Sequence, residues 1–318
     1  MISKGGKWLI ISYVAFLVIL FLMCSTDLII REPEREVYQI AVIIEDDRSD
    51  NYSNFRKGMD QAAMEFNVDV RFITLYEKAD AGQQAELMER EQQDGVDAMI
   101  VVPADEEQAY GMQMNVPVIF LRPDAATAAG SGSIVIDYGK MGGLLAHEML
   151  DKIPADCPVV ILTNPGKQSS VDRLFLEGVR EILADNGRKT DMIIWDEIEG
   201  PAAVPEAAVP QEKVALLAEN PEILTEAAGV LGDNAEAAER VCGLYGRGNT
   251  VPILNALDRG QISGICVTDD YSIGYFSVRE AVKVLEGTHS APITVESYYI
   301  EKEDLRKADF EKMLFPIE

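Results

Sequence analysis

Short apolar runs alternate with longer segments that are apolar on one side only, and no other feature constrains the fold as strongly. Residues 40–44 read IAVII, residues 98–102 read AMIVV and residues 158–162 read PVVIL. Runs without a polar residue are typical of strands that are buried on both faces of a parallel sheet. Between the runs, apolar side chains recur at helical spacing, for example at Phe55 and Met59. The alternation predicts an α/β fold in which helices cover both faces of parallel sheets.

The alternation starts again after Asp137, which predicts two lobes. Helical spacing at Met141 and Leu145 is followed by the PVVIL strand, and a further strand is expected at residues 191–195. A chain of 318 residues with 47% hydrophobic content is long enough to bury two cores. We therefore expect two doubly wound lobes with parallel sheets.

The amino terminus carries a different signal. Residues 8–24 contain no charged residue and follow Lys4 and Lys7, and their length is near the lower limit for a membrane-spanning helix. A cleavable signal peptide would end in a small-residue cleavage site, which this stretch lacks. We predict an uncleaved transmembrane helix within residues 1–30 and a charged tether at residues 31–37. The short amino-terminal flank favours a cytoplasmic start, which gives a single-pass protein of the cell membrane with an extracytoplasmic body.

The cysteines leave two questions open. Cys24 stands where a bacterial lipoprotein would be acylated, but Met23 precedes it where that signal normally has Gly, Ala or Ser. Cys157, Cys242 and Cys266 form no C-x-x-C pair, and buried free thiols are favoured over a structural disulfide among them. Because the chain has only two histidines, we expect no metal site, and no cofactor is indicated.

Charge and motifs exclude several classes of function. The net charge of −26 and the pI near 4.4 leave no basic surface for nucleic acid. The sequence has no P-loop and no G-x-S-x-G motif, so an enzyme is a remote alternative and no catalytic residue is assigned. These exclusions make the binding of a small molecule the leading hypothesis.

Polar residues gather where the apolar strands end. EDDRSDNY (45–52) follows the first strand, PADEE (103–107) follows AMIVV, and GDN (232–234) and GRGN (246–249) are their counterparts later in the chain. Because open parallel sheets bind ligands beyond the carboxyl ends of their strands, these stretches predict a binding site. The segment 197–221 is rich in Ala, Pro and Glu and reads as a surface loop followed by a helix, so we interpret it as an insertion.

In this order and spacing, the motifs resemble the type I periplasmic sugar-binding proteins. These are the solute receptors of bacterial ABC importers, and their two lobes also form the effector domain of LacI-type repressors. The resemblance covers residues 38–305 and rests on the stretches SDNYSNFRKGMDQAAMEFNV, QQDGVDAMIVVPADEE, NVPVIFLRPD, SSVDRLFLEGVREIL and ALDRGQISGICVTDDYSIGYFSVREAVKVLEG.

The resemblance also implies how the lobes are divided. In that family the two lobes close on one ligand and the chain crosses between them three times, which here falls near Asp137, Thr268 and Pro292. These crossings form a three-segment hinge. The N-terminal lobe then comprises residues 38–137 and 269–291, and the C-terminal lobe comprises residues 138–268 and 292–318.

The ligand expected from the resemblance is a monosaccharide or a close derivative. A sugar presents hydroxyls that donate and accept hydrogen bonds and C–H faces that pack on aromatic rings. Arg, Asp and Asn suit the hydroxyls, and Tyr suits the faces. The candidate ligand-binding residues are Asn51, Tyr52, Asp105, Arg122, Asp137, Arg173, Asp233, Arg247, Thr268 and Asp269.

Several of these residues have an ordinary structural alternative. Arg173 fits an arginine on the surface of a helix, and Asp105 fits the cap of a helix that begins at Glu106. Tyr52 fits core packing, and Asp233 fits a turn.

The sequence also departs from the family pattern. Gly248 stands where the family usually has an aspartate, and Leu121 stands where many members have one before Arg122. Two carboxylate acceptors for sugar hydroxyls are therefore missing. If Arg122, Arg173 and Arg247 converge, a ligand with a carboxylate or phosphate fits as well.

The resemblance leaves two partners open. A membrane-tethered solute-binding protein would deliver its sugar to an ABC permease, whereas the same body could signal as a sensor to a membrane histidine kinase. A repressor would need a helix-turn-helix before Tyr38, where the chain has its apolar segment instead. Hinge closure on a ligand serves either partner without catalysis.

Overall fold

The chain divides into two units, residues 1–37 and residues 38–318, which are described separately. The structure is a computed structural model that describes residues 4–25, 37–48, 52–122, 132–166, 168–195, 213–288 and 291–315. Asn51, most of the tether and residues 196–212 of the predicted insertion lie outside the described residues.

Among its described residues, the first unit contains one helix, α1 (Lys4–Ser25). Within the described part of the chain, no helix combines the length and apolarity that a membrane crossing requires, so the structure does not support the predicted span.

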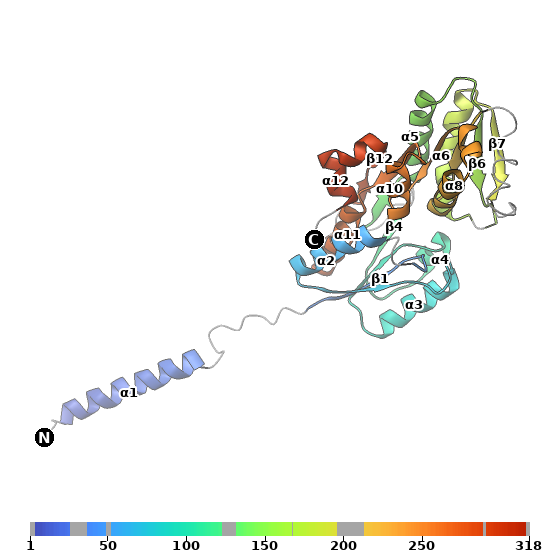
Figure 1. The fold of residues 1–318 in the computed structure, drawn as a ribbon. Coiled ribbons are helices and arrows are strands. Elements are labelled where there is room, and N and C mark those ends of the chain that lie inside the picture. Colours follow the sequence, from blue (N-terminus) through green and yellow to red (C-terminus); the bar gives the residue numbers. More distant parts are fainter. Residues whose placement is uncertain are drawn as a thin grey trace. The chain divides into compact units, whose positions relative to one another are not determined.

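The N-terminal lobe is built on a six-stranded sheet with the order β11-β5-β4-β3-β1-β2, in which all neighbours are parallel. Figure 1 labels β1 and β4 of this sheet. Its strands are β1 (Gln39–Ile43), β2 (Asp69–Ile73), β3 (Ala98–Val101), β4 (Val118–Arg122), β5 (Ile134–Ile136) and β11 (Ile293–Val295). Its helices are α2 (Ser53–Phe66), α3 (Ala81–Gln93), α4 (Glu106–Gly111) and α11 (Asp270–Leu285). The doubly wound fold predicted from the apolar runs is confirmed for this lobe.

The C-terminal lobe repeats this plan with the order β12-β10-β9-β8-β6-β7, where only β12 is antiparallel to its neighbour among the described strands. Its strands are β6 (Val159–Thr163), β7 (Thr190–Ile194), β8 (Val214–Ala218), β9 (Val241–Arg247), β10 (Gly264–Thr268) and β12 (Ser297–Ile300). Its helices are α5 (Tyr138–Lys152), α6 (Ser170–Asp185), α8 (Pro221–Asp233), α9 (Ala235–Glu239), α10 (Val251–Asp258), the 3-10 helix η3 (Lys302–Arg306) and α12 (Ala308–Leu314).

Two predictions about the chain's course are wrong. The helix expected at the end of the 197–221 segment is the buried central strand β8. Five consecutive apolar residues, VALLA, fit a strand that is buried on both faces. The segment was predicted as a helix because Ala and Leu favour helices. The third crossing between lobes falls at Glu296 rather than near Pro292, because β11 still pairs with β5 of the N-terminal sheet.

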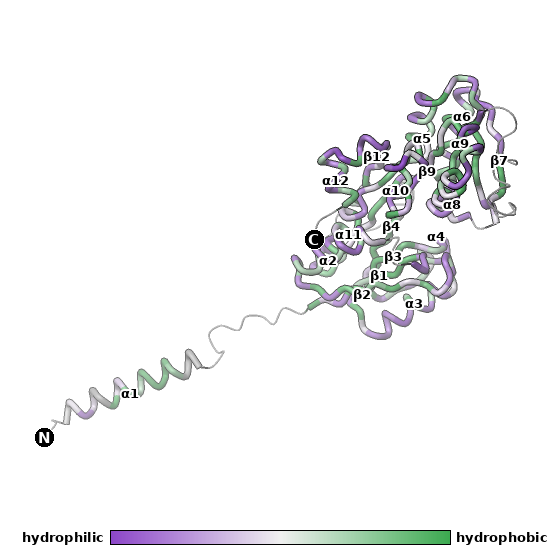
Figure 2. Tube along the Cα trace, viewed as in Figure 1, coloured by the Kyte–Doolittle hydropathy of each residue, from purple (hydrophilic) through white to green (hydrophobic). Residues whose placement is uncertain are grey.

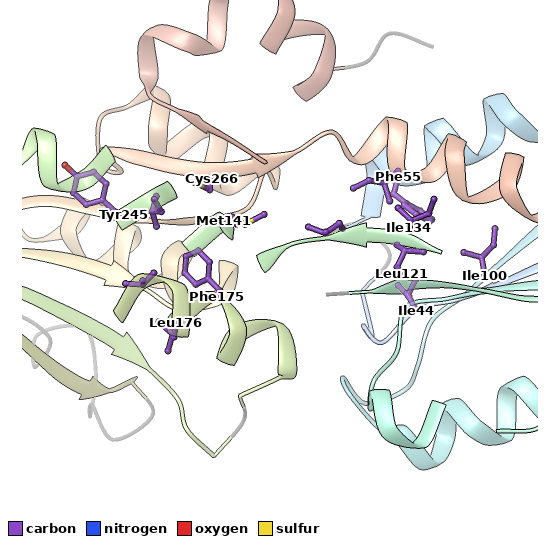
Figure 3. Packing of buried hydrophobic residues seen from close by; sticks show 14 of the residues in the cluster. Ile44, Phe55, Ile100, Leu121, Ile134, Met141, Phe175, Leu176, Tyr245 and Cys266 are labelled. Atoms are coloured by element: carbon purple, nitrogen blue, oxygen red, sulfur yellow. The ribbon is translucent and has the colours of Figure 1, made fainter. Parts of the chain in front are cut away.

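Each sheet packs on both faces because successive strand residues point in opposite directions. In β1, Ile40 and Val42 face α2 and α11, whereas Ala41 and Ile43 face the side of the sheet that contains Met88 of α3. Figure 2 shows the resulting contrast between hydrophobic strands and the hydrophilic surface of α3. Figure 3 shows the buried residues gathered at one place in each lobe.

Glycines let one pair of helices approach closely in each lobe. A Cβ on Gly58 of α2 would lie 1.9 Å from the Tyr271 carbonyl oxygen of α11. A Cβ on Gly142 of α5 would lie 1.9 Å from the Phe175 carbonyl oxygen of α6. Because only glycine permits such contacts, the amino ends of α2 and α11, and those of α5 and α6, are held near one another. These four helix ends carry much of the candidate site.

Candidate functional site

Glu219 organises the carboxyl edge of the C-terminal sheet. It follows β8 directly, and its side chain is fully buried. One carboxylate oxygen accepts hydrogen bonds from the Thr163 hydroxyl and, at 2.9 Å, from the Gln168 amide. The other oxygen accepts from the backbone N–H of Asn164 at 2.6 Å. Glu219 therefore ties the end of β8 to the end of β6.

Arg247 is fixed in the same edge by contacts with three elements. At the end of β9, its guanidinium forms an ion pair with Asp172 in the first turn of α6, and both side chains are nearly buried. Its Nε donates to the Glu219 carbonyl oxygen at 3.3 Å. The guanidinium carbon lies 5.3 Å from the ring centroid of Tyr138 and 5.5 Å from that of Phe175. The charge of Arg247 is therefore already neutralised and shielded by aromatic rings.

Asp270 forms the third part of this edge. The Thr268 hydroxyl donates to one of its oxygens at 2.7 Å, and the Asn249 amide donates to the other at 2.8 Å. Burial raises the pKa of Asp270, and the two hydrogen bonds lower it in part. The neighbouring Asp269 caps α11 by accepting from the Ser272 N–H at 3.0 Å.

The carboxyl edge of the N-terminal sheet holds Glu45 and Tyr52. The Tyr52 hydroxyl donates to the Glu45 carboxylate at 2.7 Å, and the Tyr52 ring packs edge-on against Phe55 with centroids 5.9 Å apart. Burial raises the pKa of Glu45 to about 7, although the Tyr52 hydrogen bond lowers it. Burial and the Glu45 charge together raise the pKa of Tyr52 well above its usual value.

The two edges lie close enough to interact electrostatically. Burial raises the pKa of Tyr138 to about 12, Arg247 opposes this shift, and the charges of Asp270 and Glu45 add to it. Tyr138 also contributes to the raised pKa of Tyr52. The electrostatic influence of each edge therefore reaches the other.

Ion pairs also join the two lobes. Glu222, in the first turn of α8, pairs with Arg48 after β1. Its other oxygen lies 3.1 Å from the Lys78 ammonium. All three side chains are partly exposed, so these are surface contacts between the lobes.

The structure places several candidate residues at the carboxyl edges of the sheets. Asp137 caps α5 by accepting from the Lys140 N–H at 2.8 Å, and it lies where the chain first crosses between lobes. Arg122 ends β4, but its side chain lies outside the described part of the structure. Tyr52, Arg247, Thr268 and Asp269 occupy the positions described above.

Three candidates are placed differently. Arg173 lies on the exposed side of the first turn of α6, beside the buried Asp172. Asp105 is exposed and caps α4 by accepting from the Gln108 N–H at 2.8 Å, as its structural alternative predicted. Asp233 is the exposed last residue of α8. GDN is therefore not a strand end, and the prediction that it follows a strand is wrong.

The sequence prediction missed the polar strand end that GDN was expected to provide in the C-terminal lobe. It is Glu219 with Asn220, whose side chain caps α8 by accepting from the Ile223 N–H at 3.0 Å. The signal was present, because the ENP sequence after VALLA combines a polar strand end with a cap and a proline in the first turn of the helix. Asp172, Glu45 and Asp270 were also missed, because burial of a carboxylate is not visible in a sequence.

Comparison with known proteins gives the same fold. The family model described as a periplasmic binding protein domain matches residues 40–289. No curated protein sequence matches the chain significantly. GanP, a glucose-galactose binding protein from Geobacillus stearothermophilus, is 20% identical with a TM-score of 0.71, and the match covers 86% of this chain and 100% of that one.

Two further solved structures are similar. A carbohydrate transporter solute binding protein from Agrobacterium radiobacter, in complex with D-arabinose, is 19% identical with a TM-score of 0.74, covering 88% of this chain and 99% of that one. XylFII in its complex with LytSN is 17% identical with a TM-score of 0.70, covering 84% and 99%. At these identities the structures show a common fold. Together with the family match over most of the body, they show that the chain belongs to the periplasmic binding protein family.

Proposed function

We propose that this protein binds a monosaccharide or a close, uncharged derivative between its two lobes and releases it without chemical change. The observation that carries the proposal is that the two carboxyl edges face each other: the ion pairs of Glu222 with Arg48 and Lys78 join them, and they present Tyr52 with Glu45 on one side and Tyr138 on the other. Two phenol rings and several carboxylates, contributed from both sides, suit the C–H faces and hydroxyls of a sugar. A glucose-galactose binding protein and a complex with D-arabinose among the structural relatives support this ligand class.

The charges in this region favour a neutral ligand over an acidic one. Arg247, which the sequence offered as a partner for a carboxylate or phosphate, is already paired with Asp172. An anionic ligand would have to compete for that guanidinium and would also approach Asp270 and Glu45. These carboxylates can accept hydrogen bonds from sugar hydroxyls in place of the family aspartates that Leu121 and Gly248 replace.

Arg173 is the leading candidate for an additional ligand contact. It is exposed beside Asp172 at the amino end of α6, the end that faces the carboxyl edge of the sheet. A solvated guanidinium can turn to a ligand without breaking a buried ion pair. Asn51 and Arg122 are proposed as further contacts from the N-terminal lobe because the family resemblance places them there.

Closure of the lobes would couple binding to recognition by a partner. A ligand that contacts both edges favours the closed state by the difference in its affinity for the two states. The pairing of Glu222 with Arg48 and Lys78 supports this, because it shows that the lobes offer each other complementary charges.

A thermal-shift screen of the full-length chain tests the ligand class. Aldohexoses, aldopentoses and polyols form one panel, and sugar acids and phosphosugars form a matched anionic panel. A binding sugar at about 100 times its Kd should add about 2.7 kcal/mol to the free energy of unfolding. Stabilisation by an acidic sugar alone, or by an amino acid alone, would overturn the proposal.

We propose an ABC importer as the partner, since structural relatives include solute-binding proteins of carbohydrate transport. A sensing role is the second candidate, because XylFII is a relative solved as a complex with another protein, LytSN. Deleting the gene separates the two. Loss of labelled-sugar uptake supports import, whereas intact uptake with loss of a sugar-induced transcriptional response supports sensing.

We also propose that the body is extracytoplasmic and tethered through the amino terminus. The uncharged run at residues 8–24 and the exposed apolar side chains of Trp8 and Phe21 on α1 support a tether that is embedded in a membrane. Protease added to cells with a permeable outer layer should degrade the body while the first residues stay in the membrane fraction. A mature chain that begins at a lipid-modified Cys24 would replace the uncleaved anchor with a lipoprotein anchor.

A further inference from the structure

Two cysteines meet at the amino end of the C-terminal sheet. Cys157 precedes β6 and Cys242 lies near the start of β9, yet their sulfur atoms are 3.0 Å apart. Strand β8 separates β6 from β9 in the sheet, so ordinary pairing does not account for this contact. Cys157 is buried, Cys242 is partly exposed, and both are present as thiols.

A β-bulge brings Cys242 toward Cys157. Val214 of β8 pairs with Val241, but the next residue, Ala215, pairs with Gly243. Cys242 is therefore the extra residue of β9, and such a residue is turned out of the regular alternation of side chains. On the other side, the Cys157 sulfur lies 3.6 Å from the carbonyl oxygen of Lys213, the residue before β8. The two thiols thus meet across the start of the central strand.

We propose that Cys157 and Cys242 form a disulfide once the body has left the cytoplasm. The proposal rests on the extracytoplasmic location given under the proposed function, because disulfides persist in oxidising compartments. Closing the pair requires the sulfur atoms to approach by about 1 Å, since a disulfide bond is about 2.05 Å long. The bulge and the chain end before β6 are irregular backbone that can supply this movement.

The oxidant required is a thiol–disulfide oxidoreductase in its disulfide form. Cys242 loses its proton and attacks one sulfur of the carrier, whose other sulfur leaves as a thiolate. Cys157 then loses its proton and attacks the Cys242 sulfur, which releases the carrier as a dithiol after it takes up the two protons. Burial raises the pKa of Cys157 to about 12, so the more exposed Cys242 reacts first.

The disulfide would cross-link the C-terminal lobe at the edge of the sheet opposite the binding region. Parallel strands start at one edge of a sheet and end at the other, and the site residues Arg247 and Glu219 lie at the carboxyl ends. The bridge would close a long loop that includes the segment at residues 196–212. It is therefore expected to change stability and leave the sugar affinity unchanged.

Peptide mapping of the full-length chain tests the proposal directly. Cells are quenched in acid, free thiols are alkylated under denaturing conditions, and the chain is digested with trypsin without reduction. We expect a cross-linked pair made of peptides 153–167 and 241–247, which separates on reduction. A Cys266→Ala chain should give the same pair. Alkylation of both Cys157 and Cys242 in the exported chain would overturn the proposal, whatever the sugar screen shows.

Serine variants test the structural consequence. Cys157→Ser and Cys242→Ser should each lower the Tm of the exported chain by about 5–10 °C. The double variant should be no less stable than the single ones, because either change removes the same bond. Reduction should lower the Tm of the unchanged chain and leave the double variant unaffected. If the two serine variants lower the Tm by equal and additive amounts, and do so under reduction as well, the thiols act only by packing and no disulfide forms.

Discussion

The carboxyl edges of the two sheets hold their polar groups in different ways. At the edge of the C-terminal sheet, Glu219 and Asp172 accept hydrogen bonds from groups on other segments, and Arg247 contacts both. Asp270, the first residue of α11 in the N-terminal lobe, accepts hydrogen bonds from Thr268 and Asn249 of this edge. In the described part of the N-terminal edge, the site rests on one hydrogen bond between Tyr52 and Glu45 and on the rings beside it. The C-terminal edge thus offers a fixed surface, and the N-terminal edge offers one carboxylate, Glu45, whose pKa is about 7.

This difference suggests that the two lobes, although they have the same fold, contribute differently to ligand binding. A prearranged network loses little conformational entropy when a ligand binds, so the C-terminal edge would set which hydroxyls are accepted. The N-terminal edge would respond by protonation and by closure.

The largest effect is expected from breaking the buried ion pair of the C-terminal edge. Arg247→Met leaves Asp172 without its charge partner in a nearly buried site, and we expect the free energy of unfolding to fall by about 3–5 kcal/mol. Urea unfolding measures this loss. The double variant Arg247→Met/Asp172→Asn should recover part of it, because no unpaired charge remains. A loss below about 1 kcal/mol would show that this edge is no more firmly held than the other.

Replacing a glycine at the helix contacts should destabilise both lobes equally, since each helix pair approaches through glycines. Gly58→Ala and Gly178→Ala both place a Cβ 1.9 Å from a backbone carbonyl oxygen of the facing helix. Each should lower the free energy of unfolding by about 2–3 kcal/mol. The matched control is Gly229→Ala in α8, where no atom lies within 4 Å of the new Cβ. That change should stabilise by up to about 1 kcal/mol. If only one of the two lobes tolerates the alanine, the two helix pairs are not structurally equivalent.

The N-terminal edge should show a distinct pH dependence. The pKa of Glu45 rises from 4.5 to about 7 on folding, so the folded protein binds more protons than the unfolded chain between these values. The free energy of unfolding should therefore fall as pH rises from about 4.5 to about 7. Glu45→Gln removes this fall, and above pH 7 the variant should be more stable by about 1–3 kcal/mol.

Urea unfolding at pH 5, near the start of the fall, and at pH 8, about one unit above its end, measures the Glu45 effect. Glu89→Gln, which removes a carboxylate from the exposed surface of α3, controls for the general loss of negative charge. Equal pH profiles for the two variants would place the titration elsewhere.

The smallest effect is expected at the contact between the lobes. Glu222→Gln removes the ion pairs with Arg48 and Lys78, which are partly exposed and therefore worth about 0–1 kcal/mol. We expect the affinity for the sugar found by thermal shift to fall by up to about fivefold in calorimetry. The loss should shrink in about 1 M salt. Glu236→Gln removes the ion pair with Arg240 inside the C-terminal lobe and should leave affinity unchanged.

The layered architecture can be predicted from the amino-acid sequence alone. Runs such as IAVII and PVVIL have no polar residue, and only a strand covered on both faces buries every one of their side chains. The same reasoning located polar stretches at strand ends that include Tyr52 and Arg247, whereas Thr268 came from the family resemblance. It failed at VALLA because the preceding Ala, Pro and Glu residues suggested a loop and a helix, and this error also moved the expected strand end from Glu219 to Asp233.

The folded chain is needed to see which polar side chains are buried in pairs and which are exposed. Asp172 and Arg173 are adjacent in sequence, yet one is buried in an ion pair and the other is exposed, because successive residues of a helix point to different sides. Likewise, no local pattern marks Cys157 and Cys242 as neighbours or predicts the bulge between them. Periodicity reports the local environment of each residue, whereas a charge or thiol pair depends on distant segments that meet only when the chain has folded.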